Sequence, residues 1–466
     1  QLTVRDRCDA QRRVIPRGQW QFARLENGKP APDPTSVYMA AGFEPGKVYE
    51  VVYTTKDPAM VGLGPTAIRD LISFLKYGTP NGGITLLGDQ RAFLKRAIGF
   101  GTSQSGRFLR TFLYYGFNRD ERNRRVFDGV WAHVAGAGRG SFNHRFAQPS
   151  RDGHPHMNCQ YPTDIYPFSD LPQKDTVTGL DEGILSKAQT DNVAPRIFYT
   201  NSSYEYWGRS ASLVHTSLDG RQDIGPSADT RVYLFAGSQH GPGGFPPQQA
   251  NGQNLNNAND YRWPMRALLA AMNDWLTTGK EPPASQYPLV AKDHLIAPAA
   301  LAFPKIPQVN LPLRQQKAYR ADYGPDFRTL GVVTKEPPAL GAAFPTLVPQ
   351  VNTDGNETSG IVLPVVSAPL ATYTGWNLRH PNLGATEELF SMVGSTIPFA
   401  RTAAERKKSG DPRLSIEERY KSRDEYLSKF ETAARDLVRR GYLLEADVSK
   451  IVARGAAQWD AWATPK

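Results

Sequence analysis

The chain has little cysteine and no long apolar run. Its two cysteines, Cys8 and Cys159, exclude a domain held together by many disulfides and a zinc site made of four cysteines. They leave open one disulfide or two free thiols. No apolar segment approaches the roughly 18 residues that a membrane-spanning helix needs, so we expect no membrane span.

The chain also lacks a strong imbalance of charge. Its 55 basic and 45 acidic residues give a formal net charge of +10, which raises the question of a nucleic-acid partner. However, the excess is spread along the chain, and neither a long basic run nor a nucleic-acid-binding motif is present. We therefore expect no nucleic-acid partner and interpret the charge as a diffuse surface property.

Short β-branched or aromatic runs alternate with helix-like stretches in the first part of the chain. Strands that alternate with helices favour a mostly parallel central sheet flanked by helices. We therefore predict an α/β fold whose core spans residues 1–279. The expected strands are residues 48–54, 97–100, 130–134, 196–200 and 231–236, and the expected helices are residues 67–75, 106–115 and 265–276.

The composition changes after residue 279. Prolines are concentrated between residues 280 and 375, which favours an irregular covering segment because proline interrupts helices and sheets. Within this segment, residues 354–357 resemble a tight turn, with too few ligands around them for calcium, and they lead into an expected strand over 360–363. Ser-x-x-Glu patterns at Ser415 and Ser422 predict helix starts. We expect residues 280–466 to form a Pro-rich segment and C-terminal helices packed on the core.

Residues 98–109, which read I-G-F-G-T-S-Q-S-G-R-F-L, have the pattern of a nucleophile elbow. A short strand enters a turn of small residues, and a helix leaves it. The nucleophile of such a turn has a strained backbone, so the residues two before and two after it must be small. Ser103 has Gly101 and Ser105 at these positions, whereas Ser105 would have Arg107 on one side. We therefore predict Ser103 as the nucleophile.

The oxyanion of the reaction needs two backbone donors. The amide of Gln104, directly after the nucleophile and at the start of a helix, is one expected donor. The second donor normally comes from an earlier loop, for which the segment around Lys56 is the candidate.

Hydrolases with this elbow place the acid and then the base later in the chain. His240 follows the expected strand 231–236 among small residues and is the candidate base, whereas His133 lies inside a strand and is interpreted as a core residue. Glu205 is the first carboxylate after the expected strand 196–200 and is the candidate acid. Further from a strand end are the alternative acids Asp219, Asp223 and Asp229.

A histidine and cysteine pattern raises the possibility of a metal site. His154, His156 and Cys159 form H-x-H-x-x-C, but the stretch is loop-like and has no obvious fourth ligand. We therefore expect neither a metal nor another cofactor.

Aromatic and polar residues between about 139 and 190 suggest an inserted cap. Hydrolases of this kind keep a substrate cap after the corresponding strand, although a packed loop without a ligand remains an equal alternative. Arg139 and Asn143 in this insertion, and Trp207 beside Glu205, are the candidate substrate-binding residues.

The sequence resembles a known family through several of these motifs. They are G-T-S-Q-S-G-R-F-L-R, G-A-G-R-G-S-F-N-H-R-F-A-Q-P-S, N-S-S-Y-E-Y-W-G-R and A-G-S-Q-H-G. They are similar to the large α/β-hydrolase-domain proteins of bacteria and fungi whose elbow reads G-x-S-Q-S-G-R, and the resemblance runs from about Trp20 to the C-terminus. It implies an α/β-hydrolase fold with Ser103, Glu205 and His240 as the triad. The elbow is also similar to that of glucuronoyl esterases, G-C-S-R-x-G-K, in which the first serine is the nucleophile.

The leading hypothesis is hydrolysis of a carboxylic ester, from a small molecule or a polymer, through an acyl-enzyme. The same residues leave open hydrolysis of an amide, peptide or lactone, and a non-catalytic binding protein that keeps the fold. If Cys8 and Cys159 are bonded, the disulfide favours a secreted or periplasmic protein.

Overall fold

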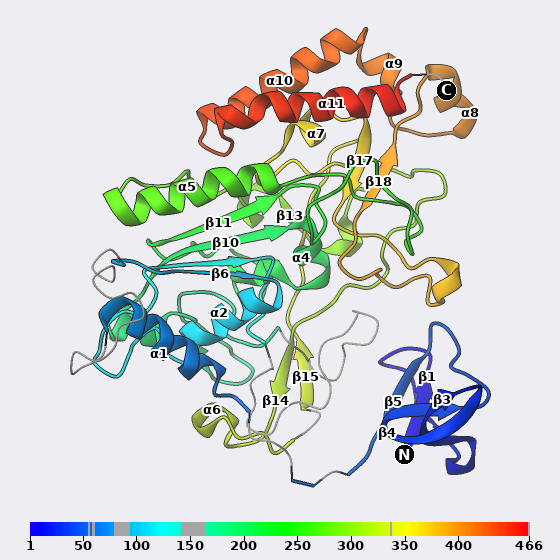
Figure 1. Ribbon diagram of the computed structural model, residues 1–466. Coiled ribbons are helices and arrows are strands. Elements are labelled where there is room, and N and C mark those ends of the chain that lie inside the picture. The colour runs from blue at the N-terminus through cyan, green and yellow to red at the C-terminus, as the bar shows by residue number, and fades with distance from the viewer. Residues whose placement is uncertain are drawn as a thin grey trace.

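A four-stranded parallel sheet forms the centre of the computed structural model, which describes residues 1–54, 56–57, 61–78, 94–140, 162, 164–335 and 338–464 (Figure 1). Its strand order is β11-β10-β7-β6, and each neighbouring pair is parallel. Consequently, the carboxyl ends of all four strands meet at one edge of the sheet. The strands are β6 (Ile98–Thr102), β7 (Gly129–His133), β10 (Arg196–Ser202) and β11 (Thr230–Phe235).

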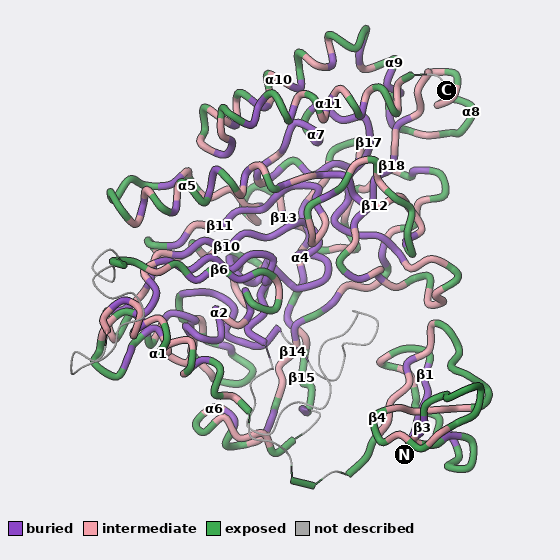
Figure 2. Tube along the Cα trace, in the orientation of Figure 1, coloured by how far each residue is buried: buried purple, intermediate pink, exposed green. Residues whose placement is uncertain are grey.

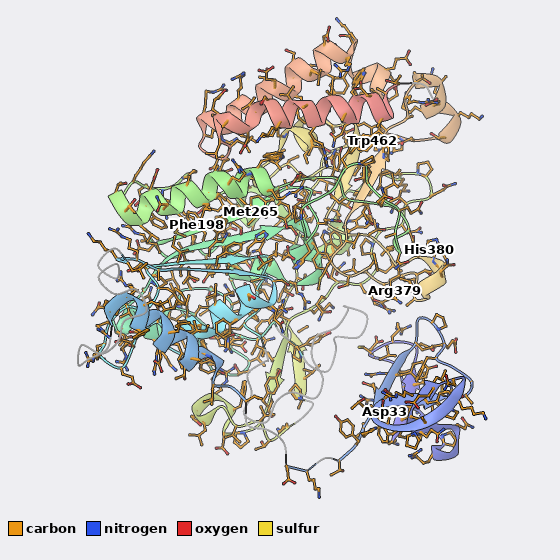
Figure 3. All side chains as sticks on the ribbon, viewed as in Figure 1. Asp33, Phe198, Met265, Arg379, His380 and Trp462 are labelled. Atoms are coloured by element: carbon orange, nitrogen blue, oxygen red, sulfur yellow. The ribbon has the colours of Figure 1, made fainter. Side chains whose placement is uncertain are left out.

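Helices cover both faces of this sheet. α2 (Gln104–Tyr114) and α1 (Gly64–Tyr77) lie on one face, and α5 (Arg262–Thr278) lies on the other (Figure 1). Consecutive residues of a strand point to opposite faces. Accordingly, Phe198 of β10 packs in the cluster that contains α5, whereas Ile197 packs with α2. Figure 3 labels Phe198 and Met265 in the layer between α5 and the sheet.

All but one of the expected strands and helices of this part of the chain belong to these central layers. The exception is the predicted strand 48–54, which forms β5 (Val48–Val51) and pairs antiparallel with β1 (Leu2–Arg5) in a separate sheet. The predicted helices 67–75, 106–115 and 265–276 correspond to α1, α2 and α5, and the predicted strands 97–100, 130–134, 196–200 and 231–236 correspond to β6, β7, β10 and β11. β7, β10 and β11 are buried along nearly all of their length, whereas the residues of the end strand β6 alternate between exposed and buried (Figure 2). The predicted strand 360–363 is wrong, because within it only Ile361 pairs, through an isolated parallel bridge to Phe235 of β11.

The C-terminal part packs on the α5 side of the sheet. α10 (Arg423–Arg439) and α11 (Val448–Trp462) begin after residues 422 and 447, and Ser422 caps α10 as its Ser-x-x-Glu pattern predicts. Phe430 and Ile451 of these helices share one buried apolar cluster with Phe198 and Trp275. The C-terminal helices therefore complete the same core that the sheet begins.

Shorter elements connect these layers. They are α3 (Ser186–Thr190), α4 (Ser203–Gly208), α6 (Phe327–Leu330), α7 (Pro364–Ser367), α8 (Ala403–Ser409), α9 (Ile416–Arg419), β8 (Gln173–Lys174), β9 (Asp181–Glu182), β12 (Leu255–Asn256), β13 (Leu295–Ile296), β14 (Tyr319–Asp322), β15 (Ala339–Ala343), β16 (Val348–Pro349), β17 (Ala371–Thr374) and β18 (Ser395–Pro398). Among the described residues, no helix is long and apolar enough to cross a membrane.

The N-terminal residues form a small β unit of their own. β1 pairs with β2 and β5, and β3 pairs with β4. A separate apolar cluster consists of Leu2, Val4, Ile15 and Trp20. The prediction of one core over residues 1–279 did not separate this cluster from the central sheet. Cys8 of this unit is disulfide-bonded, and Cys159 lies outside the described residues. The strands are β1 (Leu2–Arg5), β2 (Arg13–Ile15), β3 (Trp20–Glu26), β4 (Lys29–Met39) and β5 (Val48–Val51).

Candidate active site

Ser103 occupies the turn between β6 and α2 with an unusual backbone conformation. Its φ is 56° and its ψ is −114°, a combination that costs energy for a residue with a side chain. Its amide donates a hydrogen bond to the carbonyl of His133 at 2.8 Å. A Cβ atom on Gly101 would clash with the carbonyl of Ser105, so the turn requires glycine there. Ser105 itself lies in the first turn of α2, and the strained residue is Ser103.

The start of α2 lies directly at this serine. The carbonyl of Ser103 accepts the first helical hydrogen bond, from the amide of Arg107 at 2.9 Å. Gln104 is the first residue of the helix, and the first amides of a helix have no intrahelical acceptor. The Gln104 amide is therefore a backbone donor beside Ser103, at the positive end of the helix dipole.

Glu205 and His240 are brought together although 35 positions separate them. Glu205 lies in α4, directly after β10, and His240 lies in the loop after β11. Nδ1 of His240 is 2.5 Å from Oε1 of Glu205. An ionised carboxylate only accepts hydrogen bonds, so Nδ1 is the donor to Glu205. When the ring carries a single proton, Nε2 is therefore the nitrogen that can act as a base.

The second oxygen of Glu205 is held by a capping box. Oε2 accepts hydrogen bonds from the amide of Ser202 at 2.9 Å and from the hydroxyl of Ser202 at 2.5 Å. Burial of the whole side chain opposes ionisation, but the charge of His240 and the hydrogen bonds from His240 and Ser202 outweigh it, so the pKa of Glu205 is lowered. The buried carboxylate is therefore kept in the form that can orient an imidazole.

The His240 loop is fixed by several neighbours. The hydroxyl of Tyr261 donates a hydrogen bond to the carbonyl of His240, and the ring of Tyr204 packs edge-on against the imidazole at 5.9 Å between centroids. The amide of Gly394 donates to the side chain of Gln239 at 3.1 Å. Among the contacts of the described residues there is no hydrogen bond between Ser103 and His240, and both belong to loops at the carboxyl edge of the sheet. Such catalytic contacts are often long in the absence of substrate.

Two of the alternative acids, Asp219 and Asp223, have partners other than the candidate base. Asp219 accepts hydrogen bonds from Ser217 and Arg221 in its own turn. Asp223 accepts from the amides of Val290 and Ala291. Glu205 is thus the carboxylate that the fold places against His240.

His133 is a core residue, as the sequence indicated. It is 3 % exposed and its Nδ1 shares a 2.9 Å hydrogen bond with the hydroxyl of Thr200. Burial lowers the pKa of His133 to about 4, so the ring is neutral near pH 7.

The other predicted site residues have different surroundings from those expected. Lys56 is exposed and follows β5, which pairs with β1 in the N-terminal unit, so it does not follow a strand of the central sheet as an oxyanion loop should. Trp207 is 3 % exposed and packs against Trp376 in a buried cluster. Arg139 is also buried, donates to the carbonyl of Tyr166 and stacks on Tyr114. Neither of these two buried side chains lines an open surface.

Several of the candidate residues named from the sequence lie outside the described part of the chain. They are Asn143, His154, His156 and Cys159. Among the described residues, no group of three or more His, Cys, Asp or Glu side chains is placed to hold a metal ion.

Two residues that contribute to the site, Ser202 and Glu357, were not predicted from the sequence. Ser202 and Glu205 form the Ser-x-x-Glu pattern of a capping box, so the sequence did carry a signal for that contact. Glu357 also joins the site, through Ser203 and Gly237. No local pattern marks it, because it lies 154 positions from Ser203.

A parallel sheet with a strained serine after one strand, and an acid and a histidine after later strands, defines the α/β-hydrolase fold. A family model described as an alpha/beta hydrolase domain matches residues 21–453, and the chain belongs to this family. The predicted fold class is thereby confirmed, and the chain is a hydrolase in the general sense. Neither the curated proteins nor the solved structures contain a match to the chain.

Proposed function

We propose that the protein is a serine hydrolase that cleaves carboxylic esters with a triad of Ser103, His240 and Glu205. The observation that carries the proposal is the 2.5 Å contact between Glu205 and His240, which follow the strained Ser103 along the chain in the order of a hydrolase triad. The natural ester, whether a small molecule or part of a polymer, is left open by this proposal.

The proposed reaction has two stages. Oγ of Ser103 attacks the ester carbonyl while Nε2 of His240 takes the hydroxyl proton of this serine. The amide of Gln104 stabilises the oxyanion that forms. Collapse of this intermediate transfers the proton to the leaving alkoxide and forms the acyl-enzyme. His240 then takes a proton from water, which attacks the acyl carbonyl. Collapse of the second intermediate releases the acid while His240 returns the proton to Oγ of Ser103.

A fluorophosphonate tests the nucleophile directly. We expect one covalent adduct, mapped to Ser103 by mass spectrometry, and no adduct in Ser103→Ala. Ser105→Ala is the matched control and should still be labelled. An adduct on Ser105, or no adduct with the native protein, would contradict the proposal.

Matched substrates separate esterase activity from the other reactions of this fold. We expect turnover of short p-nitrophenyl esters and at least about 100-fold slower turnover of the matched p-nitroanilides, since amides are poorer acyl donors. Equal rates would favour an amidase instead.

We also propose that the protein works in an oxidising compartment, as a secreted or periplasmic protein. The disulfide at Cys8 supports this, because structural disulfides are rare where thiols are kept reduced. Two titratable thiols in the denatured protein without reductant would remove the support.

A further inference from the structure

Glu357 lies against both segments that carry the acid and the base of the proposed triad. Its Oε2 atom accepts hydrogen bonds from Oγ of Ser203 at 2.5 Å and from the amide of Gly237 at 2.8 Å. Ser203 is two positions before Glu205, and Gly237 is three positions before His240. One carboxylate oxygen therefore joins the start of α4 to the loop after β11.

Two further hydrogen bonds close this junction. The amide of Ser238 donates to Oγ of Ser203 at 3.1 Å, and the amide of Tyr204 donates to the carbonyl of Ser238 at 3.3 Å. Ser203 and Ser238 are fully buried and Glu357 is 5 % exposed. Water therefore has little access to replace the carboxylate as acceptor at this point.

The backbone around the junction leaves little freedom for another arrangement. Gly237 has a φ of +60°, and a Cβ atom on Gly375 would clash with that of Ser203. Glu357 is itself held by an antiparallel bridge to Val351 across the turn of residues 352–356. The carboxylate is thus presented by a fixed turn to two fixed segments.

Glu357 also lacks the partner that a buried carboxylate normally has. Within the described residues it forms no ion pair with a basic side chain, and burial raises the pKa of Glu357 to about 7 against the effect of its two hydrogen bonds. Burying a carboxyl group in this way costs stability, and such groups are concentrated at functional sites.

We propose that Glu357 is a positioning residue that sets the placement of His240 relative to Glu205. This inference rests on the proposed function. Glu357 acts through Ser203 and Gly237 and does not touch the reacting atoms. Without its acceptor, the two segments lose the carboxylate that bridges them and keep only the direct hydrogen bonds of Ser238 with Ser203 and Tyr204. The 2.5 Å pairing of Glu205 with His240 is then less well defined.

The test compares two substitutions of Glu357 in the full-length protein. Glu357→Ala removes the acceptor, and we expect it to lower kcat for a p-nitrophenyl ester at least tenfold with KM changed less than threefold. The rate of fluorophosphonate labelling of Ser103 should fall by a similar factor. Glu357→Gln keeps a carbonyl oxygen at the same distance along the side chain, and should retain kcat within threefold of the native value.

A control and a second variant keep the test decisive. Asp354→Asn alters the same turn, where Asp354 pairs with Arg419, and should leave kcat unchanged. Ser203→Ala removes only the hydroxyl that joins Glu357 to Ser238. It should lower kcat three- to tenfold, and this loss tests the junction even if Glu357→Ala does not fold.

The outcomes separate this inference from the proposed function. If the native protein is labelled and active but Glu357→Ala and Ser203→Ala keep kcat within twofold, the positioning role is overturned and the esterase proposal stands. Equal losses in Glu357→Gln and Glu357→Ala would also overturn it, since the acceptor would not be what matters. If the native protein is neither labelled nor active, both proposals fail.

Discussion

Glu205 is the residue on which the candidate site depends most. Its two carboxylate oxygens have separate tasks: Oε1 faces His240, and Oε2 holds the N-terminus of α4 through Ser202. Because the side chain is fully buried, water cannot take over either contact. Loss of its charge should therefore affect both catalysis and folding.

At the residue scale, we predict that Glu205→Gln lowers kcat for an ester by at least about 100-fold, because the neutral amide does not stabilise the imidazolium. KM should change little. Asp219→Asn, which changes an exposed alternative acid, is the control and should keep kcat within twofold. Steady-state kinetics on both variants checks this, and equal losses would remove Glu205 from the triad.

The lowered pKa of Glu205 also has a consequence for stability. A carboxyl group whose pKa is lower in the folded than in the unfolded state stabilises the fold above its unfolded pKa, and this contribution is lost as the pH falls through the folded pKa. We therefore expect that, as the pH decreases below about 4.5, the free energy of unfolding falls less steeply for Glu205→Gln than for the native protein. Urea unfolding at several acidic pH values measures this difference.

The elbow between β6 and α2 is the element that presents the proposed nucleophile, Ser103. Its geometry depends on the absence of a side chain at residue 101, where the strand passes the first turn of the helix. The serine itself has a strained conformation that only the flanking strand and helix maintain.

At the element scale, we predict that Gly101→Ala displaces the turn and slows fluorophosphonate labelling of Ser103 at least tenfold. Relief of the clash requires backbone movement, so we also expect a loss of about 1–3 kcal/mol in the free energy of unfolding. Gly225→Ala is the control, because a Cβ atom there meets nothing within 4 Å. Native labelling in Gly101→Ala would mean that the turn tolerates a side chain.

The whole molecule is held by a core that the C-terminal helices share with the sheet. Phe430 of α10 is 2 % exposed and packs against Gly455 of α11. It belongs to the same cluster as Phe198 and Phe235 of the sheet. The Pro-rich segment, which lies between the sheet and the C-terminal helices in the chain, supplies Glu357 to the site. The C-terminal part therefore contributes to both stability and site geometry.

At this scale, we predict that Phe430→Ala lowers the free energy of unfolding by about 3–5 kcal/mol. Because the cluster reaches the sheet, thermal unfolding should remain a single transition with a lower Tm. Lys450→Ala, at an exposed position of α11, should leave Tm unchanged. Separate transitions for the helices and the sheet would contradict a shared core.

The order of the elements was predictable from the sequence, whereas the surroundings of individual residues were not. The aromatic and polar character of Trp207 and Arg139 suggests a pocket lining, yet packing of the C-terminal segment and of Tyr114 buries them. Lys56 follows the first expected strand, but that strand, β5, does not pair with the central sheet. Sequence position alone does not specify which surfaces other segments will cover.

Local patterns in the sequence are enough to predict the alternation of strands and helices, the elbow at Ser103 and the order in which Glu205 and His240 follow it. These features depend on local periodicity and on small residues at fixed spacing, which act within a few positions of the chain. The tertiary structure alone decided the pairing of Glu205 with His240 and the position of Glu357 beside Ser203. Such contacts join segments that only the packing of the whole chain brings together, and no local pattern encodes that packing.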